Sequence, residues 1–183
     1  MRATGSLDIA LGLALVLSSS TAARASHAAH PAPADFRCPV AVRFSPHGGA
    51  EGAVVDTLRR ARVRVHAAIY GLTNPAIETA LADLARAGVK VALKADRTQT
   101  SRKSQGALLA RLSEAGVAVE VLQARALLHD KFAIVDDRWV ITGSFNWTAR
   151  AERANRENVL IFDCPALASN FEAEWGDIPT RQR

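Results

Sequence analysis

Apolar and polar positions alternate along residues 38–183 in a way that predicts short strands separated by helices. The stretch Val63–Tyr70 is apolar and rich in β-branched residues, which predicts a buried strand. After it, Asn74 is a predicted helix cap, and leucine or isoleucine recurs every three or four positions until Gly88. Similar patterns predict strands at Val40–Phe44, Ala118–Leu122 and Val159–Phe162, and helices at Gly52–Arg60 and Pro165–Trp175.

Two segments, Leu81–Val91 and Leu109–Val119, have the same pattern: a predicted helix, a glycine that ends it, and the start of a strand. Successive crossover units of a parallel sheet have this order. We therefore expect an α/β fold with a mixed, mostly parallel β-sheet flanked by helices on both faces. Functional groups should lie at strand ends and in the loops that follow, because the packed interior is apolar. The polar segment Asp96–Gln105 lacks apolar periodicity and is expected to be a surface loop.

The N-terminus has the features of a secretory signal peptide in residues 1–25. Arg2 precedes the apolar run Ile9–Leu17, and Ala23-Arg24-Ala25 offers a cleavage site between small residues. The run is too short to span ~30 Å of hydrocarbon, so we expect export to the periplasm or medium and no stable membrane anchor. Residues 26–37 are rich in Ala, Pro and His and predict a disordered lead-in, which leaves residues 38–183 as a single domain.

Composition agrees with one soluble globular domain, since 49% of the 183 residues are hydrophobic and 22% are charged. The net charge of +5 favours a polyanionic partner such as DNA or RNA, although scattered arginines on solvated faces would give the same total. Aromatic residues make up only 5%, which disfavours an enzyme that works on a lipid surface. Within the polar segment, Arg97, Arg102 and Lys103 are candidate nucleic-acid contacts.

The two cysteines, Cys38 and Cys164, do not form a C-x-x-C pair, so they do not indicate a zinc site. They flank the first and last predicted strands of the domain. In an exported protein they would form one long-range disulfide, and two separate buried thiols are the alternative. Carboxylates are not clustered with the spacing of hard-metal ligands, and we expect neither a metal nor a cofactor.

The strongest chemical signal is the run from His129 to Asn146. On an extended strand His129 and Lys131 project from the same face, about 7 Å apart. An imidazole beside an ammonium, with the Ser144 hydroxyl and the Asn146 amide nearby, is suited to binding a phosphate and attacking it. The alternative is an ordinary β-hairpin that turns at Asp136-Asp137-Arg138 and has solvated strand ends.

The run resembles the signature of the phospholipase D superfamily, His-x-Lys-x4-Asp-x6-Gly-Ser-x-Asn, and matches it at every specified position. The matching residues are His129, Lys131, Asp136, Gly143, Ser144 and Asn146. Less specific similarities are Phe44-Ser45-Pro46, Ala68-Ile69-Tyr70 and Asn155-x-Glu157-Asn158. The resemblance implies an α/β/α sandwich. With this length and a predicted signal peptide, the chain looks like a member of the small bacterial endonuclease branch of the superfamily.

The resemblance also implies roles for these residues. His129 would attack phosphorus and form a phosphohistidine, with Lys131 stabilising charge. Glu157 would accept the other ring N–H of His129, although a strand-edge carboxylate facing Arg156 is the alternative. Asp136 belongs to the signature and so to the catalytic set, but it is better placed to organise the hairpin turn. Ser144 and Asn146, with Gly143, would bind the phosphate oxygens.

Members of the superfamily use two His-x-Lys motifs for each active site, and this chain has one. The resemblance therefore implies a homodimer with its active site at the two-fold interface. His47 and His66 are the residues that could supply a second imidazole within one chain, although a solvated loop and a packed strand are simpler explanations for them. The function expected is non-specific, metal-independent endonuclease activity on DNA or RNA. A phospholipase D-type phospholipid hydrolase or transferase is the alternative, and a non-catalytic nucleic-acid-binding module a lesser one.

Overall fold

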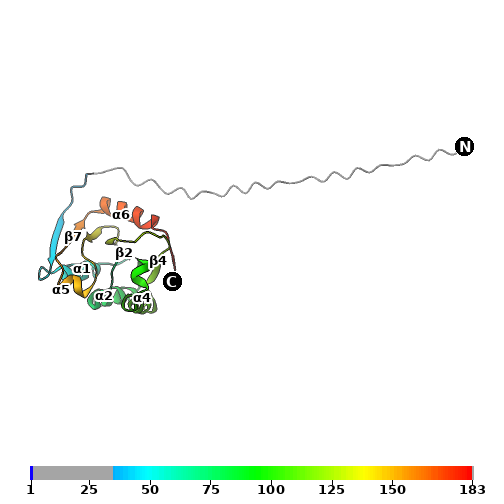
Figure 1. Cartoon of the computed structure of the whole chain (residues 1–183). Coiled ribbons are helices and arrows are strands. Elements are labelled where there is room, and N and C mark those ends of the chain that lie inside the picture. The colour runs from blue at the N-terminus through cyan, green and yellow to red at the C-terminus, as the bar shows by residue number, and fades with distance from the viewer. Residues whose placement is uncertain (2–34, 183) are drawn as a thin grey trace.

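The computed structural model describes Met1 and residues 35–182, so the predicted signal peptide and most of the lead-in lie outside the described residues. The described chain folds into an eight-stranded sheet in the order β1-β7-β6-β5-β2-β3-β4-β8. Helices cover both faces of this sheet (Figure 1). The strands are β1 (Val40–Ser45), β2 (Arg64–Ile69), β3 (Lys90–Ala95), β4 (Ala118–Leu122), β5 (Lys131–Val135), β6 (Trp139–Gly143), β7 (Glu157–Asp163) and β8 (Thr180–Gln182). The helices are α1 (Ala50–Leu58), α2 (Pro75–Arg86), α3 (Arg97–Thr100), α4 (Lys103–Glu114), α5 (Ala149–Arg153) and α6 (Pro165–Asp177).

The mixed sheet with helices on both faces is confirmed, but the prediction that the sheet is mostly parallel is wrong. Strand β3 runs parallel to β2 and β4, whereas the other five pairings between described strands are antiparallel. The parallel part corresponds to the two similar helix-glycine-strand segments recognised in the sequence. The hairpin β5–β6 and strands β1, β7 and β8 supply the antiparallel part.

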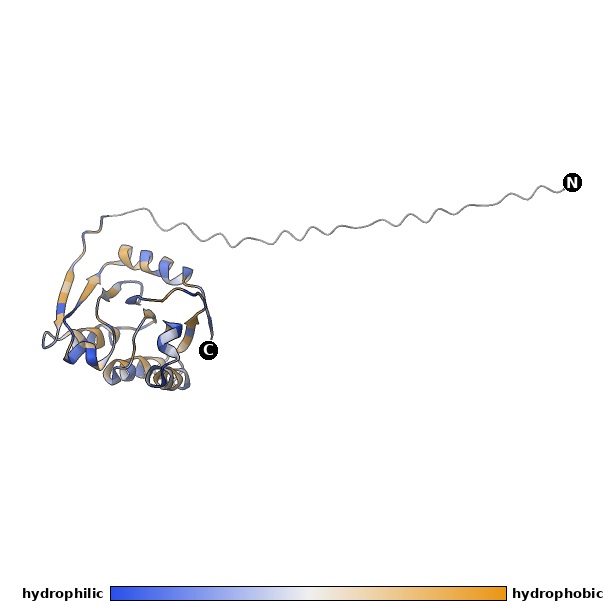
Figure 2. Cartoon of the chain, viewed as in Figure 1, coloured by the Kyte–Doolittle hydropathy of each residue, from blue (hydrophilic) through white to orange (hydrophobic). Residues whose placement is uncertain are grey.

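The two faces of the sheet support different apolar cores. Along β5, Ala133 and Val135 belong to the core under α1, α2 and α4, whereas Phe132 and Ile134 belong to the core under α6. This alternation follows from the two-residue period of a strand. Figure 2 shows apolar strands in the interior, with helices of mixed polar and apolar residues around them. Strand β5 is buried along its whole length, so the residues at its start are held firmly in place.

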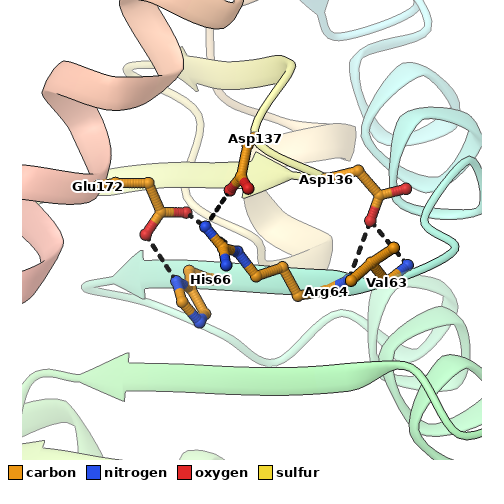
Figure 3. A network of polar contacts seen from close by, with 6 residues as sticks. All are labelled: Val63, Arg64, His66, Asp136, Asp137 and Glu172. Atoms are coloured by element: carbon orange, nitrogen blue, oxygen red, sulfur yellow. Dashed lines mark hydrogen bonds and ion pairs between the residues drawn. The ribbon is translucent and has the colours of Figure 1, made fainter.

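Helix α6 is fastened to the sheet by a group of polar and aromatic contacts (Figure 3). His66 of β2 lies with Nδ1 2.7 Å from Glu172 Oε2, and its ring stacks on Trp175 with 4.1 Å between ring centres. Arg64 pairs with Asp137 and lies 3.9 Å from Glu172. The interpretation of His66 as a packing residue of a strand is therefore confirmed. These contacts fix the position of α6 against β2.

The polar segment 96–105 is not the loop that was predicted, because it contains α3 and the start of α4. Asp96 is the cap of α3, where its Oδ1 accepts a hydrogen bond from the N–H of Gln99 at 2.9 Å. Its Oδ2 accepts a second bond, at 3.0 Å, from the N–H of Leu128. The fully buried Asp96 carboxyl group thus joins α3 to the segment that leads into β5.

Cys38 and Cys164 form a disulfide, with 5.5 Å between their Cα atoms. Of the two alternatives for these cysteines, the pairing is the one that the structure bears out. The bond links the segment before β1 to the N-cap of α6. Among the described residues, none of the helices has the length and apolar character needed to cross a membrane.

Candidate active site

His129 and Lys131 lie together at the start of β5. Lys131 is the first residue of the strand, and its Nζ lies 3.1 Å from His129 Nδ1. The Tyr70 ring packs beside both, 4.7 Å from the His129 ring centre and 5.2 Å from Lys131 Nζ. Gln99 of α3 donates a hydrogen bond of 2.7 Å to the Tyr70 hydroxyl and so fixes that ring. The structure therefore brings together the imidazole and ammonium singled out in the sequence.

Burial and neighbouring charges set the protonation of this group. Burial lowers the pKa of Lys131, and the charges of Asp130 and Glu157 act in the opposite direction. Burial raises the pKa of Asp130, whereas the positive charges of Lys131 and His129 act to lower it. The Lys131 residue is only 9% exposed, and this burial strengthens the attraction of its ammonium group for an incoming anion.

Ser144 and Glu157 lie on neighbouring strand ends and are joined by hydrogen bonds. Ser144 Oγ donates to Glu157 Oε2 at 2.6 Å, and the Asn158 N–H donates to Ser144 Oγ at 3.1 Å. Asn155 Nδ2 donates to the other oxygen of Glu157 at 3.0 Å. Among the described residues, Glu157 forms neither the predicted hydrogen bond with His129 nor an ion pair with Arg156. Its charge nevertheless acts on Lys131, which places it within the same site.

Gly143 is required where β6 meets β7. Its φ of 143° is a conformation that other L-residues rarely adopt, and a Cβ there would lie 2.3 Å from the Asn158 carbonyl oxygen. The glycine allows this close approach, and the Ser144 N–H then donates to Asn158 Oδ1 at 3.3 Å. Gly143 therefore contributes to the site by positioning Ser144.

Asn146 lies in the segment after β6, close to the residue that follows Tyr70. Its side chain packs against Gly71, the residue that follows Tyr70. Its Oδ1 is buried and has no hydrogen-bond partner among the described residues. The next residue, Trp147, is buried, and its carbonyl accepts hydrogen bonds from the N–H groups of residues 73 and 74. Asn146 is therefore held in place, and its Nδ2 amide is the group that can donate to a phosphate oxygen.

Asp136, the remaining signature residue, does not lie with these side chains. It occupies the turn at the opposite end of β5 from Lys131, with a φ of 50°. Its carboxylate accepts hydrogen bonds from the N–H groups of Arg62, Val63 and Arg64 at 2.7, 2.9 and 2.9 Å. These bonds hold the β5–β6 turn against the start of β2, which agrees with the predicted role of Asp136 in organising the hairpin turn.

The other candidates lie at varying distances from the site. Arg97, Arg102 and Lys103 are exposed on α3 and α4, and α3 touches the site through Gln99. His47 is exposed in the turn after β1 and takes no part in the contacts described above. Tyr70, Asn155 and Asn158 were not expected to be site residues, although each stands in a segment of the sequence resemblance. Asp130 had no signal in the sequence.

A family model described as "Cardiolipin synthase, PLD-like domain" matches residues 54–177. A protein named phospholipase D from Rickettsia conorii is 32% identical over 139 residues, which cover 76% of this chain and 68% of that protein. A mitochondrial cardiolipin hydrolase from Chlamydomonas reinhardtii is 34% identical over 121 residues, or 66% of this chain and 53% of the other.

Solved structures share the fold. Nuc from Salmonella typhimurium, described as a phospholipase D family member, superposes with a TM-score of 0.77 at 30% identity, covering 80% of this chain and 99% of Nuc. NucT from Helicobacter pylori gives a TM-score of 0.71 at 23% identity, over 78% and 96% of the two chains. At that identity NucT is evidence for the fold alone.

Proposed function

Because the chain belongs to the phospholipase D superfamily and is a phosphodiesterase of that kind, we propose that it is an exported endonuclease that cleaves DNA or RNA without a metal ion. The observation that carries this proposal is the exposed His129 ring held against the desolvated Lys131 ammonium. The imidazole ring supplies the nucleophile. The ammonium supplies the positive charge that a phosphodiester in the transition state requires.

The reaction proceeds in two displacements. The ring nitrogen of His129 that carries no proton attacks phosphorus; a P–N bond forms and the bond to the leaving alkoxide breaks. The histidinium of a second subunit donates its proton to that alkoxide. The same group then takes a proton from water as the water attacks phosphorus and releases His129. Lys131, Ser144 and Asn146 donate hydrogen bonds to the phosphate oxygens in both steps.

A homodimer would supply the second histidine, because the chain has one His-x-Lys motif. A surface suited to a second copy lies next to the site on the edge strand β1. Val40, Val42 and Phe44 alternate along this strand and are 49%, 41% and 60% exposed. Phe44 pairs with Asn158, the neighbour of Ser144. The apolar edge strand at the margin of the sheet is visible in Figure 2, and burial against a two-fold partner would remove it from water.

Two further features support an exported nuclease. The net charge of +5 favours a polyanionic substrate. The disulfide between Cys38 and Cys164 fits an oxidising compartment, in keeping with the predicted signal peptide. Phospholipid hydrolysis is the second candidate, favoured by the names phospholipase D and cardiolipin hydrolase that the relatives carry. A purely binding role does not explain why the histidine and lysine are held in contact.

The test is to incubate the purified protein with single-stranded DNA, plasmid, RNA and phospholipid vesicles in EDTA. We expect the protein to cleave nucleic acid without added metal. The cleavage rate should fall by several orders of magnitude in His129→Ala. The matched control is His47→Ala, an exposed histidine outside the site, which should retain full activity. Activity that stops in EDTA and returns with Mg²⁺ would contradict the mechanism. Cleavage of phospholipid but not of nucleic acid would establish the second candidate instead.

A further inference from the structure

His129, Lys131 and Gly143 help to line a pocket of about 530 Å³, and the proposed reaction gives no role to its remaining walls. Phe132 of β5 lines it on the sheet side. Helix α6 lines the other side with residues spaced three or four apart, so that they form one stripe of the helix. These residues are Leu167, Asn170, Phe171 and Glu174. The Phe132 and Phe171 rings meet edge to face with 5.0 Å between their centres.

The α6 wall of this pocket is already in place without a ligand. A neighbouring stripe of α6 carries Glu172 and Trp175, which contact β2 through His66 (Figure 3). Trp175 Nε1 also donates a hydrogen bond of 3.1 Å to the Ala67 carbonyl. Because the helix is anchored through this second stripe, a ligand would not have to order it on binding.

Apart from His129 and Lys131, the polar groups of the pocket are unsuited to a phosphate. Asp130 lines it with a half-buried carboxyl group that has no hydrogen bond among the described residues. Glu174 adds a second carboxyl group and Asn170 an amide. Two carboxyl groups would repel an anion, so the pocket suits a neutral part of the substrate that is attached to the phosphate. Burial raises the pKa of Asp130, and N–H donors on a ligand would stabilise its ionised form.

We propose that this pocket binds an unpaired nucleobase next to the scissile phosphate, and that it favours bases with N–H donors, above all guanine. This inference rests on the proposed nuclease function. A planar base fits against the partly exposed Phe171 ring, and its donor edge meets the carboxyl and amide groups. In a duplex that edge is occupied by base pairing and the base is stacked. The enzyme is therefore selective for guanine in single strands and not in duplexes.

The experiment uses an end-labelled oligonucleotide of thymidines with one central deoxyguanosine, cut by the full-length protein and resolved on a denaturing gel. The quantity measured is cleavage at the phosphates beside guanine relative to the thymidine–thymidine phosphates in the same lane. We expect a ratio of at least about 5, which corresponds to about 1 kcal/mol at 25 °C. Annealing the complementary strand should bring this ratio close to one.

The variants Asn170→Ala and Phe171→Ala should also lower the ratio toward one. Ser169→Ala, an exposed position on the same helix, is the matched control and should keep it. Because the ratio is internal to each lane, partial loss of folded protein does not change it. Cleavage with equal probability at every phosphate would overturn the base pocket and leave the nuclease proposal standing. Absence of nucleic-acid cleavage, with release of an amine head group from phosphatidylethanolamine vesicles, would overturn both.

Discussion

Asp136 belongs to the sequence signature, and its negative charge stabilises the folded state. Burial acts to raise the pKa of its carboxyl group, but hydrogen bonds from the backbone N–H groups of Arg64, Val63 and Arg62 outweigh it and the pKa is lowered. A carboxyl group whose pKa is lower in the folded state stabilises the fold above the unfolded pKa. This stabilisation is lost as the pH falls through the folded pKa.

Asp136→Asn should therefore destabilise the protein by about 1–3 kcal/mol at pH 7, because a neutral amide is a weaker acceptor for these N–H groups. The difference from wild type should shrink as the pH falls below the ordinary pKa of an aspartate, about 3.9. Urea denaturation at pH 7 and pH 3 measures both quantities. A variant with wild-type stability but without activity would place Asp136 in the catalytic set.

Gly143 offers a second test at the residue scale. In Gly143→Ala the new methyl group would collide with the Asn158 carbonyl and push the ends of β6 and β7 apart. We expect a loss of stability of about 1–3 kcal/mol, with activity reduced at least about tenfold through displacement of Ser144. The matched control is Gly52→Ala in α1, where nothing lies within 4 Å of the added Cβ. That variant should gain up to about 1 kcal/mol and keep full activity.

Among the structural elements, β1 is an edge strand, and the disulfide holds its start. The cysteines are 126 residues apart in the sequence, so the bond restricts a long loop in the unfolded chain. Replacing both cysteines by alanine should lower the free energy of unfolding by roughly 3–5 kcal/mol, measured by denaturant titration. Thiol titration of the unreduced wild type should detect no free cysteine. Two free thiols per chain would contradict the pairing.

The sequence allowed most elements to be predicted, since strands such as β2 and helices such as α2 have one apolar face. Strand direction could not be predicted, because the two-residue period is the same in parallel and antiparallel pairs. The helix α3 was missed because none of its residues is buried, so it has no apolar stripe. Its cap, Asp96, was a local signal that could have revealed it.

The site was predictable to the extent that its residues are close in the sequence. His129, Lys131, Ser144 and Asn146 lie within one hairpin and its flanking segments. The wall that faces them comes from α6, and no local pattern relates Asn170 or Phe171 to His129. Such long-range juxtapositions depend on how α6 packs on the sheet, which the hydrophobic pattern does not specify.

At the scale of the whole molecule, the proposed site requires two subunits. Mixed dimers of wild type and His129→Ala should be nearly inactive, because each lacks one of the two histidines. Activity should then follow the square of the wild-type fraction and fall to about one quarter in an equal mixture, against about one half for independent sites. Activity assays after verified subunit exchange distinguish the two. A fully active monomer in light scattering would show instead that one chain completes the site.

The division of α6 into two stripes has a consequence for how this enzyme can change. Glu172 and Trp175 attach the helix to β2, whereas Asn170 and Phe171 line the pocket. Substitutions at Asn170 leave this attachment intact, whereas Phe171 also packs on Phe132, so substrate preference can evolve at position 170 with the least loss of folded protein. A library randomised at residue 170 should consequently contain mostly folded members. Helix α6 is thus the natural starting point for directed evolution of selectivity in this chain.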